Sequence, residues 1–172
     1  MRGRGWTLVE LLIAIAISML VGGALVSVLR TYVDVDNAFS HRATTLNNVR
    51  AAYGLLSREL RHSCAIPSGN QHSITFRYPS GTASSVVSYQ FVGGGLQRRL
   101  TGDPSGWVRV TPRVISFRLT YLDALGNPIS PPVTEQDDET VSRIDITLAV
   151  TSPTRADTIT VSGSVIPQNL KT

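Results

Sequence analysis

The sequence predicts an α+β fold in which one long N-terminal helix packs on an antiparallel β-sheet. Before Pro67 the chain contains no proline, and its apolar residues follow helical spacing. After Pro67 it consists of short runs rich in β-branched and aromatic residues, separated by Gly, Pro, Asp and Ser. A length of 172 residues allows one modest domain, and a single cysteine excludes an internal disulfide scaffold. Together these patterns favour the α+β class.

The first expected element is an apolar run from Trp6 to Leu29 that contains one ionisable side chain, Glu10. A helix over this run would be about 36 Å long, which is enough to cross a bilayer core of about 30 Å. Arg2 and Arg4 precede the run without any acidic residue. Because basic residues favour the cytoplasmic side, the N-terminus is predicted to be cytoplasmic and the bulk of the chain to lie across the membrane.

The apolar run does not end like an ordinary secretory signal peptide. Leu25 to Thr31 offers no small-x-small cleavage site, and the one Ala-x-Ala sequence, Ala14 to Ala16, lies in the middle of the run. We therefore expect residues 6–29 to remain as a membrane segment.

From Arg30 the pattern becomes amphipathic. Apolar residues recur at steps of three and four, with polar residues between them: Val35, Phe39, Ala43, Leu46, Val49, Tyr53, Leu56 and Leu60. One helix is predicted from about Trp6 to about Leu60, and residues 30–66 are assigned to the amphipathic half that packs on the sheet.

Residues 67–172 are predicted to form a β-rich globular head. The cluster Pro67-Ser68-Gly69-Asn70 is expected to terminate the helix. The strand-like runs that follow are Ser73–Tyr78, Ser85–Val92, Leu96–Leu100, Trp107–Val110, Val114–Leu122, Val141–Val150 and Thr158–Ile166.

The residues Gly5-Trp6-Thr7-Leu8-Val9-Glu10-Leu11-Leu12-Ile13-Ala14 resemble the class III signal of type IV pilins and type II secretion pseudopilins. The resemblance implies a leader peptide of residues 1–5, cleavage after Gly5 by a prepilin peptidase, and N-methylation of the new N-terminal residue, Trp6. Family members most often have Phe at that position. The fifth mature residue would be Glu10, which agrees with the family.

In filaments of this family, Glu10 of one subunit would face the Trp6 amine of a neighbour. Glycine at the cleavage site lets a protease approach the scissile bond, and cleavage creates an α-amine beside an apolar helix. A misplaced partner would leave an uncompensated charge at low dielectric, at a cost of about 3–5 kcal/mol. Glu10 is therefore expected to select the assembly register and to have no catalytic role.

The head resembles the minor pilin branch that is PilW/GspJ/ComGF-like, on three segments: Val92 to Leu96, Tyr121 to Asn127 and Val165 to Asn169. The resemblance implies a pilin-like fold and the function of a minor type IV pilin in the pilus tip or initiation complex. It also implies a location in the bacterial inner membrane, with a periplasmic or external head, and in the pilus at the cell surface. Implied partners are other minor and major pilins, the prepilin peptidase, the inner-membrane assembly platform and the membrane itself.

Three alternatives remain open from the sequence. Instead of a minor type IV pilin, the chain would be a minor pseudopilin of a type II secretion system, a DNA-binding subunit of a competence pilus, or a membrane-anchored binding module that never polymerises. Gene neighbourhood would distinguish the machines.

No pattern points to enzymatic chemistry, a cofactor or a metal. His62 and Cys64 point apart on a helix, and Gly93-Gly94-Gly95 lacks the Lys-Ser/Thr of a phosphate loop. One cysteine and three dispersed histidines give no zinc spacing. The acidic segment Glu135, Asp137, Asp138 and Glu139 lacks EF-hand spacing, so it is interpreted as a solvated loop, with calcium binding as the alternative.

Charge is divided along the head. Six arginines and one acid lie between Arg77 and Arg118, and six acids and one arginine lie between Asp123 and Asp145. One hypothesis is that the two patches steer the subunit onto unlike neighbours; another is that they are unrelated surface loops. A third hypothesis is that the head binds DNA. In this hypothesis Trp107 stacks on a base, and the DNA phosphates contact a basic patch formed by Arg98, Arg99, Arg109 and Arg113.

Overall fold

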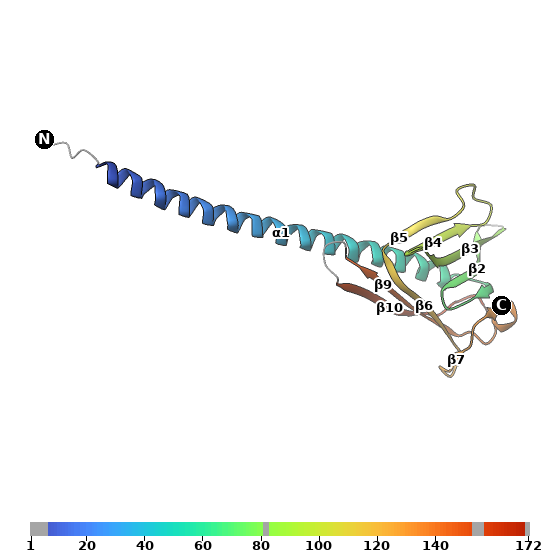
Figure 1. Cartoon of the computed structure of the whole chain (residues 1–172). Helices are drawn as coiled ribbons and strands as arrows, with labels where there is room; N and C mark the ends of the chain where they lie inside the picture. The colour runs from blue at the N-terminus through green and yellow to red at the C-terminus, as the bar shows by residue number, and fades with distance from the viewer. Residues whose placement is uncertain (1–6, 81–82, 153–156, 171–172) are drawn as a thin grey trace. The chain divides into compact units, whose positions relative to one another are not determined.

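The structure, a computed structural model, describes residues 7–80, 83–152 and 157–170 (Figure 1). A single long helix precedes a series of strands and one short 3-10 turn. In chain order these elements are α1 (Leu8–Arg61), β1 (Ala65–Gly69), β2 (Ser73–Ser80), β3 (Ala83–Val92), β4 (Gly95–Leu100), β5 (Val108–Pro112), β6 (Val114–Leu122), β7 (Pro128–Ile129), β8 (Val133–Thr134), η1 (Glu135–Asp137), β9 (Arg143–Thr151) and β10 (Thr158–Val165). The chain divides into two compact units, residues 1–41 and 42–172.

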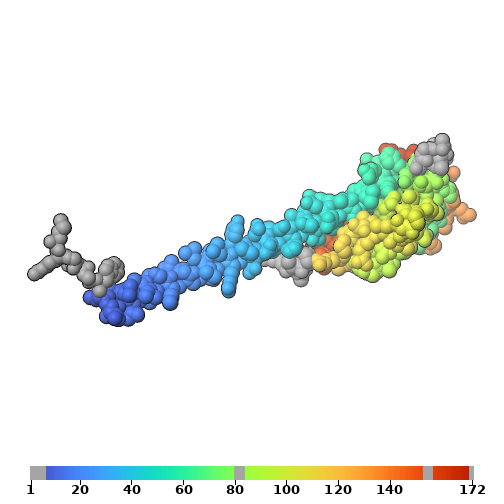
Figure 2. Space-filling view, turned by 90° about the horizontal axis from the view of Figure 1, so that it is seen from above, coloured from blue at the N-terminus to red at the C-terminus, as the bar shows by residue number. Residues whose placement is uncertain are grey.

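In the first unit, the described residues of α1 are almost entirely exposed (Figure 2, blue). Large apolar side chains point outward all around the helix, with exposed fractions of 75% at Leu8, 75% at Leu20 and 67% at Phe39. The helix is long and apolar enough to cross a membrane. Such a surface is stable only where lipid or other protein replaces water around it.

In the second unit, the remainder of α1 is amphipathic, as the spacing predicted. The prediction is wrong for Val35 and Phe39, which lie in the first unit and are 47% and 67% exposed. Val49, Ala52, Leu56 and Leu60 are buried at steps of three and four, and the opposite face is exposed. This part of the helix lies alongside β3, β4 and β5 (Figures 1 and 2). The prediction of one long helix packed on antiparallel strands is confirmed.

The predicted end of the helix is wrong in its detail. The sequence assigns residues 30–66 to the helix, whereas the helix ends at Arg61 and strand β1 occupies Ala65–Gly69. The pairing of β1 with β2 shifts register between Ala65 and Ser68. Proline has no N–H to donate, so an interruption of the ladder accommodates it within a strand.

The strands form two antiparallel sheets where the sequence predicted one. The six-stranded sheet has the order β5-β4-β3-β2-β1-β8, and the four-stranded sheet has the order β10-β9-β6-β7. All seven predicted strands are present, with boundaries that agree or differ by at most two residues. The unpredicted strands β7 and β8 have two residues each, which is too short for an alternating pattern to be recognised.

The core lies where α1 meets the inner faces of the two sheets. Its largest fully buried side chains include Phe76, Phe117, Tyr89 and Tyr121, and the rings of Phe76 and Tyr89 stack with centroids 6.1 Å apart. The helix approaches β10 closely at Gly163, which has no side chain. A Cβ at this position would collide with the Tyr53 hydroxyl. A side chain larger than hydrogen at this position would push the helix away from the sheet.

Candidate assembly site

Helix α1 begins with a reciprocal cap between Thr7 and Glu10. The Glu10 amide donates to the Thr7 hydroxyl over 3.3 Å, while the Thr7 amide and hydroxyl donate to Glu10 Oε2 over 3.2 and 3.3 Å. This pattern is a capping box, which satisfies amide groups that the first helical turn leaves free. It draws the Glu10 carboxylate toward the start of the helix. The Thr-x-x-Glu spacing from Thr7 to Glu10 is the local sequence signal for this cap.

Two predicted site residues cannot be placed. Gly5 and Trp6, the residues of the expected peptidase cleavage and methylation, lie outside the described residues. The predictions of cleavage after Gly5 and methylation of Trp6 therefore stay predictions.

The apolar surface that follows Glu10 is continuous along the helix. Exposed fractions are 55% at Leu11, 43% at Ile15, 55% at Val21 and 58% at Leu29. From Leu11 to Leu29 no side chain is ionisable. A surface of this kind can bind other apolar helices or lipid, and Glu10 supplies its one charge.

A second polar cluster holds the helix to the six-stranded sheet inside the head. Glu59 of α1 accepts hydrogen bonds from the Tyr89 hydroxyl over 2.6 Å and from Arg98 over 2.7 and 3.2 Å. The side chains of Glu59 and Arg98 are only 12% and 24% exposed. Burial, reinforced by the hydrogen bond to Glu59, raises the pKa of Tyr89 above its ordinary value. The hydrogen bond to Glu59 likewise raises the pKa of Arg98.

The predicted basic patch is divided between the two faces of β4. Arg98 points to Glu59, whereas the next residue, Arg99, lies over the Trp107 ring with its guanidinium carbon 4.8 Å from the ring centre. Successive side chains of a strand point to opposite faces. Arg109, opposite Gln97, shares the face of Arg99 and is exposed. The exposed outer face thus carries Arg99 and Arg109 without Arg98.

Arg113 has a different position from the other three arginines. It lies between β5 and β6 with a positive φ of 59°, a conformation that non-glycine residues rarely adopt. Its carbonyl accepts a hydrogen bond from the Thr151 amide over 3.1 Å. The residue therefore joins the two sheets at a corner.

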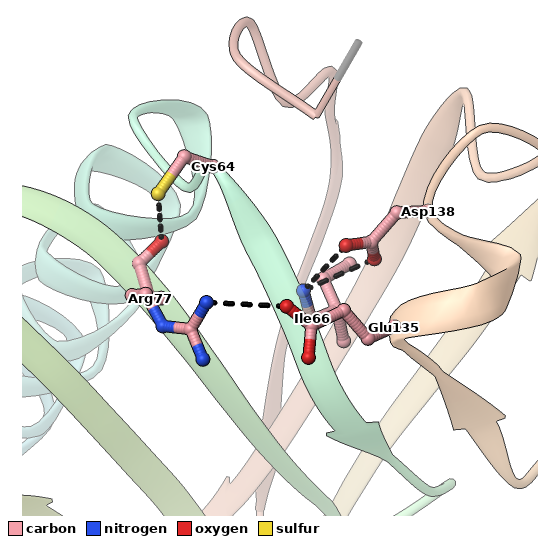
Figure 3. A network of polar contacts seen from close by, with 5 residues as sticks. All are labelled: Cys64, Ile66, Arg77, Glu135 and Asp138. Atoms are coloured by element: carbon pink, nitrogen blue, oxygen red, sulfur yellow. Dashed lines mark hydrogen bonds and ion pairs between the residues drawn. The ribbon is translucent and has the colours of Figure 1, made fainter. Parts of the chain in front are cut away.

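The interpretation of the acidic segment as a solvated loop is wrong for Asp138. This carboxylate is 7% exposed and accepts the Ile66 amide over 3.0 and 3.2 Å (Figure 3). Burial raises the pKa of Asp138. The contact ties the segment after η1 to the start of β1.

The neighbouring acids also have partners within the head. Glu135 pairs with Arg77 over 3.1 Å (Figure 3), and Asp137 accepts the amide and the hydroxyl of Thr134 over 2.8 and 3.1 Å. Cys64 lies nearby and donates its thiol to the Arg77 carbonyl. In the described ranges, no group of three His, Cys, Asp or Glu side chains is arranged to hold a metal ion.

Neither a scan against protein-family models nor a search of curated proteins finds a match to the chain.

Proposed function

We propose that this chain is a minor type IV pilin, a structural subunit of the pilus tip or initiation complex. In this proposal the precursor inserts with its N-terminus in the cytoplasm, is cleaved after Gly5 and is methylated on Trp6. The subunit then joins other pilins through the apolar part of α1. It performs no chemistry of its own.

One observation carries the proposal: a helix that supplies the core of the head also presents a long, uncovered apolar surface with a single carboxylate at its start. Leu8 and Leu20 are each 75% exposed, whereas Val49 and Leu60 of the same helix are fully buried. Exposing this much apolar surface to water would be costly, so it requires lipid or neighbouring helices.

Glu10 gives this surface its selectivity. Cleavage after Gly5 would place a new α-amine on Trp6, close to the carboxylate in sequence. The Thr7–Glu10 cap holds the carboxylate at the helix start, where a cation from a neighbouring subunit could reach it. A neighbour in the wrong register would leave that charge unpaired in an apolar setting.

Replacement of Glu10 by Gln tests the proposal, because Gln also serves in a capping box but carries no charge. We expect E10Q to be inserted and cleaved like the wild type and to be at least tenfold depleted from sheared pilus fractions. Thr7→Ala is the matched control, since it breaks the cap and keeps the carboxylate. Normal incorporation of E10Q would refute the proposed role of Glu10, and absence of the wild-type chain itself from the pilus fractions would favour an anchored module that never polymerises.

The same features would serve a minor pseudopilin of a type II secretion system. The two machines differ in the neighbours that the apolar helix meets. Crosslinking of the wild-type chain in its native membrane, followed by identification of the attached subunits, separates them: pilus subunits support the proposal and secretion subunits replace it.

A further inference from the structure

The edges of the two sheets are protected unequally. The six-stranded sheet ends in β5 and β8, and the four-stranded sheet ends in β7 and β10. Strands β7 and β8 have two residues each. Strand β5 carries Arg109 and Pro112, and its ladder with β4 shifts register. Short edges, charges, prolines and irregular register are the devices that keep sheets from pairing with other chains.

Strand β10 has none of these devices. It runs for eight residues along one margin of the head (Figure 1), and its sequence, TITVSGSV, contains no charge and no proline. It pairs with β9 in an unbroken antiparallel register from Thr158↔Thr151 to Val165↔Ile144. Among the described strands β9 is its one neighbour, so the backbone groups along its outer side face away from the sheet.

The side chains of β10 define what would fit beside it. One face presents a row of exposed hydroxyls, from Thr158, Thr160, Ser162 and Ser164. The other face presents small or apolar groups toward the core, from Ile159, Val161, Gly163 and Val165. A matching strand would carry Ser or Thr on its outer face and small or β-branched residues on its inner face. Charged residues at those positions would lose hydration without gaining a partner.

We propose that the outer edge of β10 is a docking site for an extended, uncharged segment of an unlike subunit, which adds a fifth strand to the four-stranded sheet. In such β-strand addition, backbone hydrogen bonds supply affinity and the alternating side chains supply specificity. The free edge, the unbroken register and the neutral hydroxyl-rich pattern all meet its requirements.

A second copy of β10 would fit the pattern as well, with Thr160 opposite Ser162 in an antiparallel pair. However, β10 and the head half of α1 run the same way, since Tyr53 faces Gly163 and the Gln168 amide bonds to the Arg61 carbonyl. Such a pair would set these helix halves antiparallel. All subunits enter the membrane in one direction in the proposed function, on which this choice of an unlike chain rests.

The test uses the full chain in detergent and a fluorescent synthetic peptide with the sequence of residues 158–166, whose uncharged strand pattern matches the expected occupant. We expect saturable binding by fluorescence anisotropy. A peptide with proline in place of Val161 should bind at least tenfold more weakly. Absence of binding, or equal binding of the proline peptide, overturns the proposal.

Variants of the chain locate the binding edge. The double variant Thr160→Lys and Ser162→Lys places charge on the exposed face of β10, and it should bind the peptide at least tenfold more weakly while melting at the wild-type temperature. Thr147→Lys makes the same change on the adjacent inner strand β9 and should leave binding unchanged. If the double lysine variant binds like the wild type, the site is not β10.

Disulfide trapping in a Cys64→Ser background identifies the occupant. Ser162→Cys should crosslink to a peptide with Cys at the position of Thr160, and Thr147→Cys should not. A crosslink at Thr147→Cys would mean that the peptide displaces β10. Thr160→Cys chains that crosslink to Ser162→Cys chains without peptide would identify a second copy as the occupant; each result overturns the assignment. E10Q should bind the peptide normally, so failure of this inference is distinguishable from failure of the proposed function.

Discussion

Glu59 of α1 and Arg98 of β4 form a two-point contact, with the Arg98 Nη2 and Nε atoms 2.7 and 3.2 Å from the two carboxylate oxygens. Because Tyr89 donates to the same carboxylate, the helix is fastened to two adjacent strands of the sheet. Polar contacts with little solvent exposure fix a position more strictly than apolar packing does, since displacement leaves charges unpaired.

Replacement of Glu59 by Ala should destabilise the head by about 2–4 kcal/mol, because it leaves the Arg98 guanidinium and the Tyr89 hydroxyl without their acceptor. Urea unfolding of the chain in detergent measures the loss. Arg143→Ala is the control: it breaks the Arg143–Asp145 pair, whose side chains are 44% and 40% exposed, and should cost less than about 1 kcal/mol. Equal losses for both variants would contradict the structural role of Glu59.

The stability of the head should fall at alkaline pH. Burial raises the pKa of Tyr89 and of Tyr121 in the folded chain. Their contribution is therefore fully present below the unfolded-state pKa of about 10 and decreases as the pH rises above it. In Tyr89→Phe the decrease in unfolding free energy between pH 9 and pH 11 should be smaller. A slope identical to that of the wild type would show that Tyr89 is not protected from ionisation.

Asp138 should tolerate amidation better than truncation. Asp138→Ala leaves the fully buried Ile66 amide unsatisfied and should cost about 1–3 kcal/mol. Asp138→Asn keeps an acceptor oxygen and removes the burial of a charge, so it should cost less. Thermal melting at pH 7 compares the two, with Glu139→Ala as the exposed control. The reverse order would contradict the assigned hydrogen bond.

Two glycines should respond oppositely to the same change. A Cβ at Gly69 would lie 2.6 Å from the hydroxyl oxygen of the buried Tyr121, so Gly69→Ala should destabilise by about 1–3 kcal/mol through overpacking. A Cβ at Gly54 of α1 meets nothing within 4 Å. Gly54→Ala should therefore stabilise by about 0.5–1 kcal/mol through helix propensity, measured by the same melts.

The predicted DNA binding reduces to a sharp test on one face of the sheet. If phosphates bind there, the double variant Arg99→Ala and Arg109→Ala should lower the slope of log affinity against log salt by about 2. Arg118→Ala, on the other sheet, is the control. A wild-type chain whose DNA binding is unchanged between 50 and 200 mM salt, or absent, would remove this alternative.

Most of the architecture was predictable because each helix or strand is specified by the pattern of residues within its own segment. The apolar steps from Leu46 to Leu60 specify which side of α1 is buried, and alternation specifies the longer strands. The pairing of Glu59 with Arg98 was not predictable, since it depends on residues 39 positions apart meeting across a helix and a sheet. For the same reason, the sequence placed Arg98 and Arg99 in one basic patch.

The prediction of a solvated loop for the acidic segment was wrong at Asp138 for a related reason. Its composition is typical of a solvated loop, yet Asp138 is buried because a backbone amide 72 residues away needs an acceptor. By contrast, the Thr7–Glu10 cap is a local pattern that the sequence contains. Long-range satisfaction of single polar groups is the information that local patterns lack.

The position of β9 sets the order in which the head can be built during synthesis. This strand lies between β10 and β6 and is the last but one in the chain. The buried stripe of α1 is made first, and the side that packs toward the four-stranded sheet stays uncovered until residues 143–151 have emerged. Folding that depends on contacts so distant in sequence is slow. Until it is complete, the exposed apolar stripe of α1 is the kind of surface that chaperones bind.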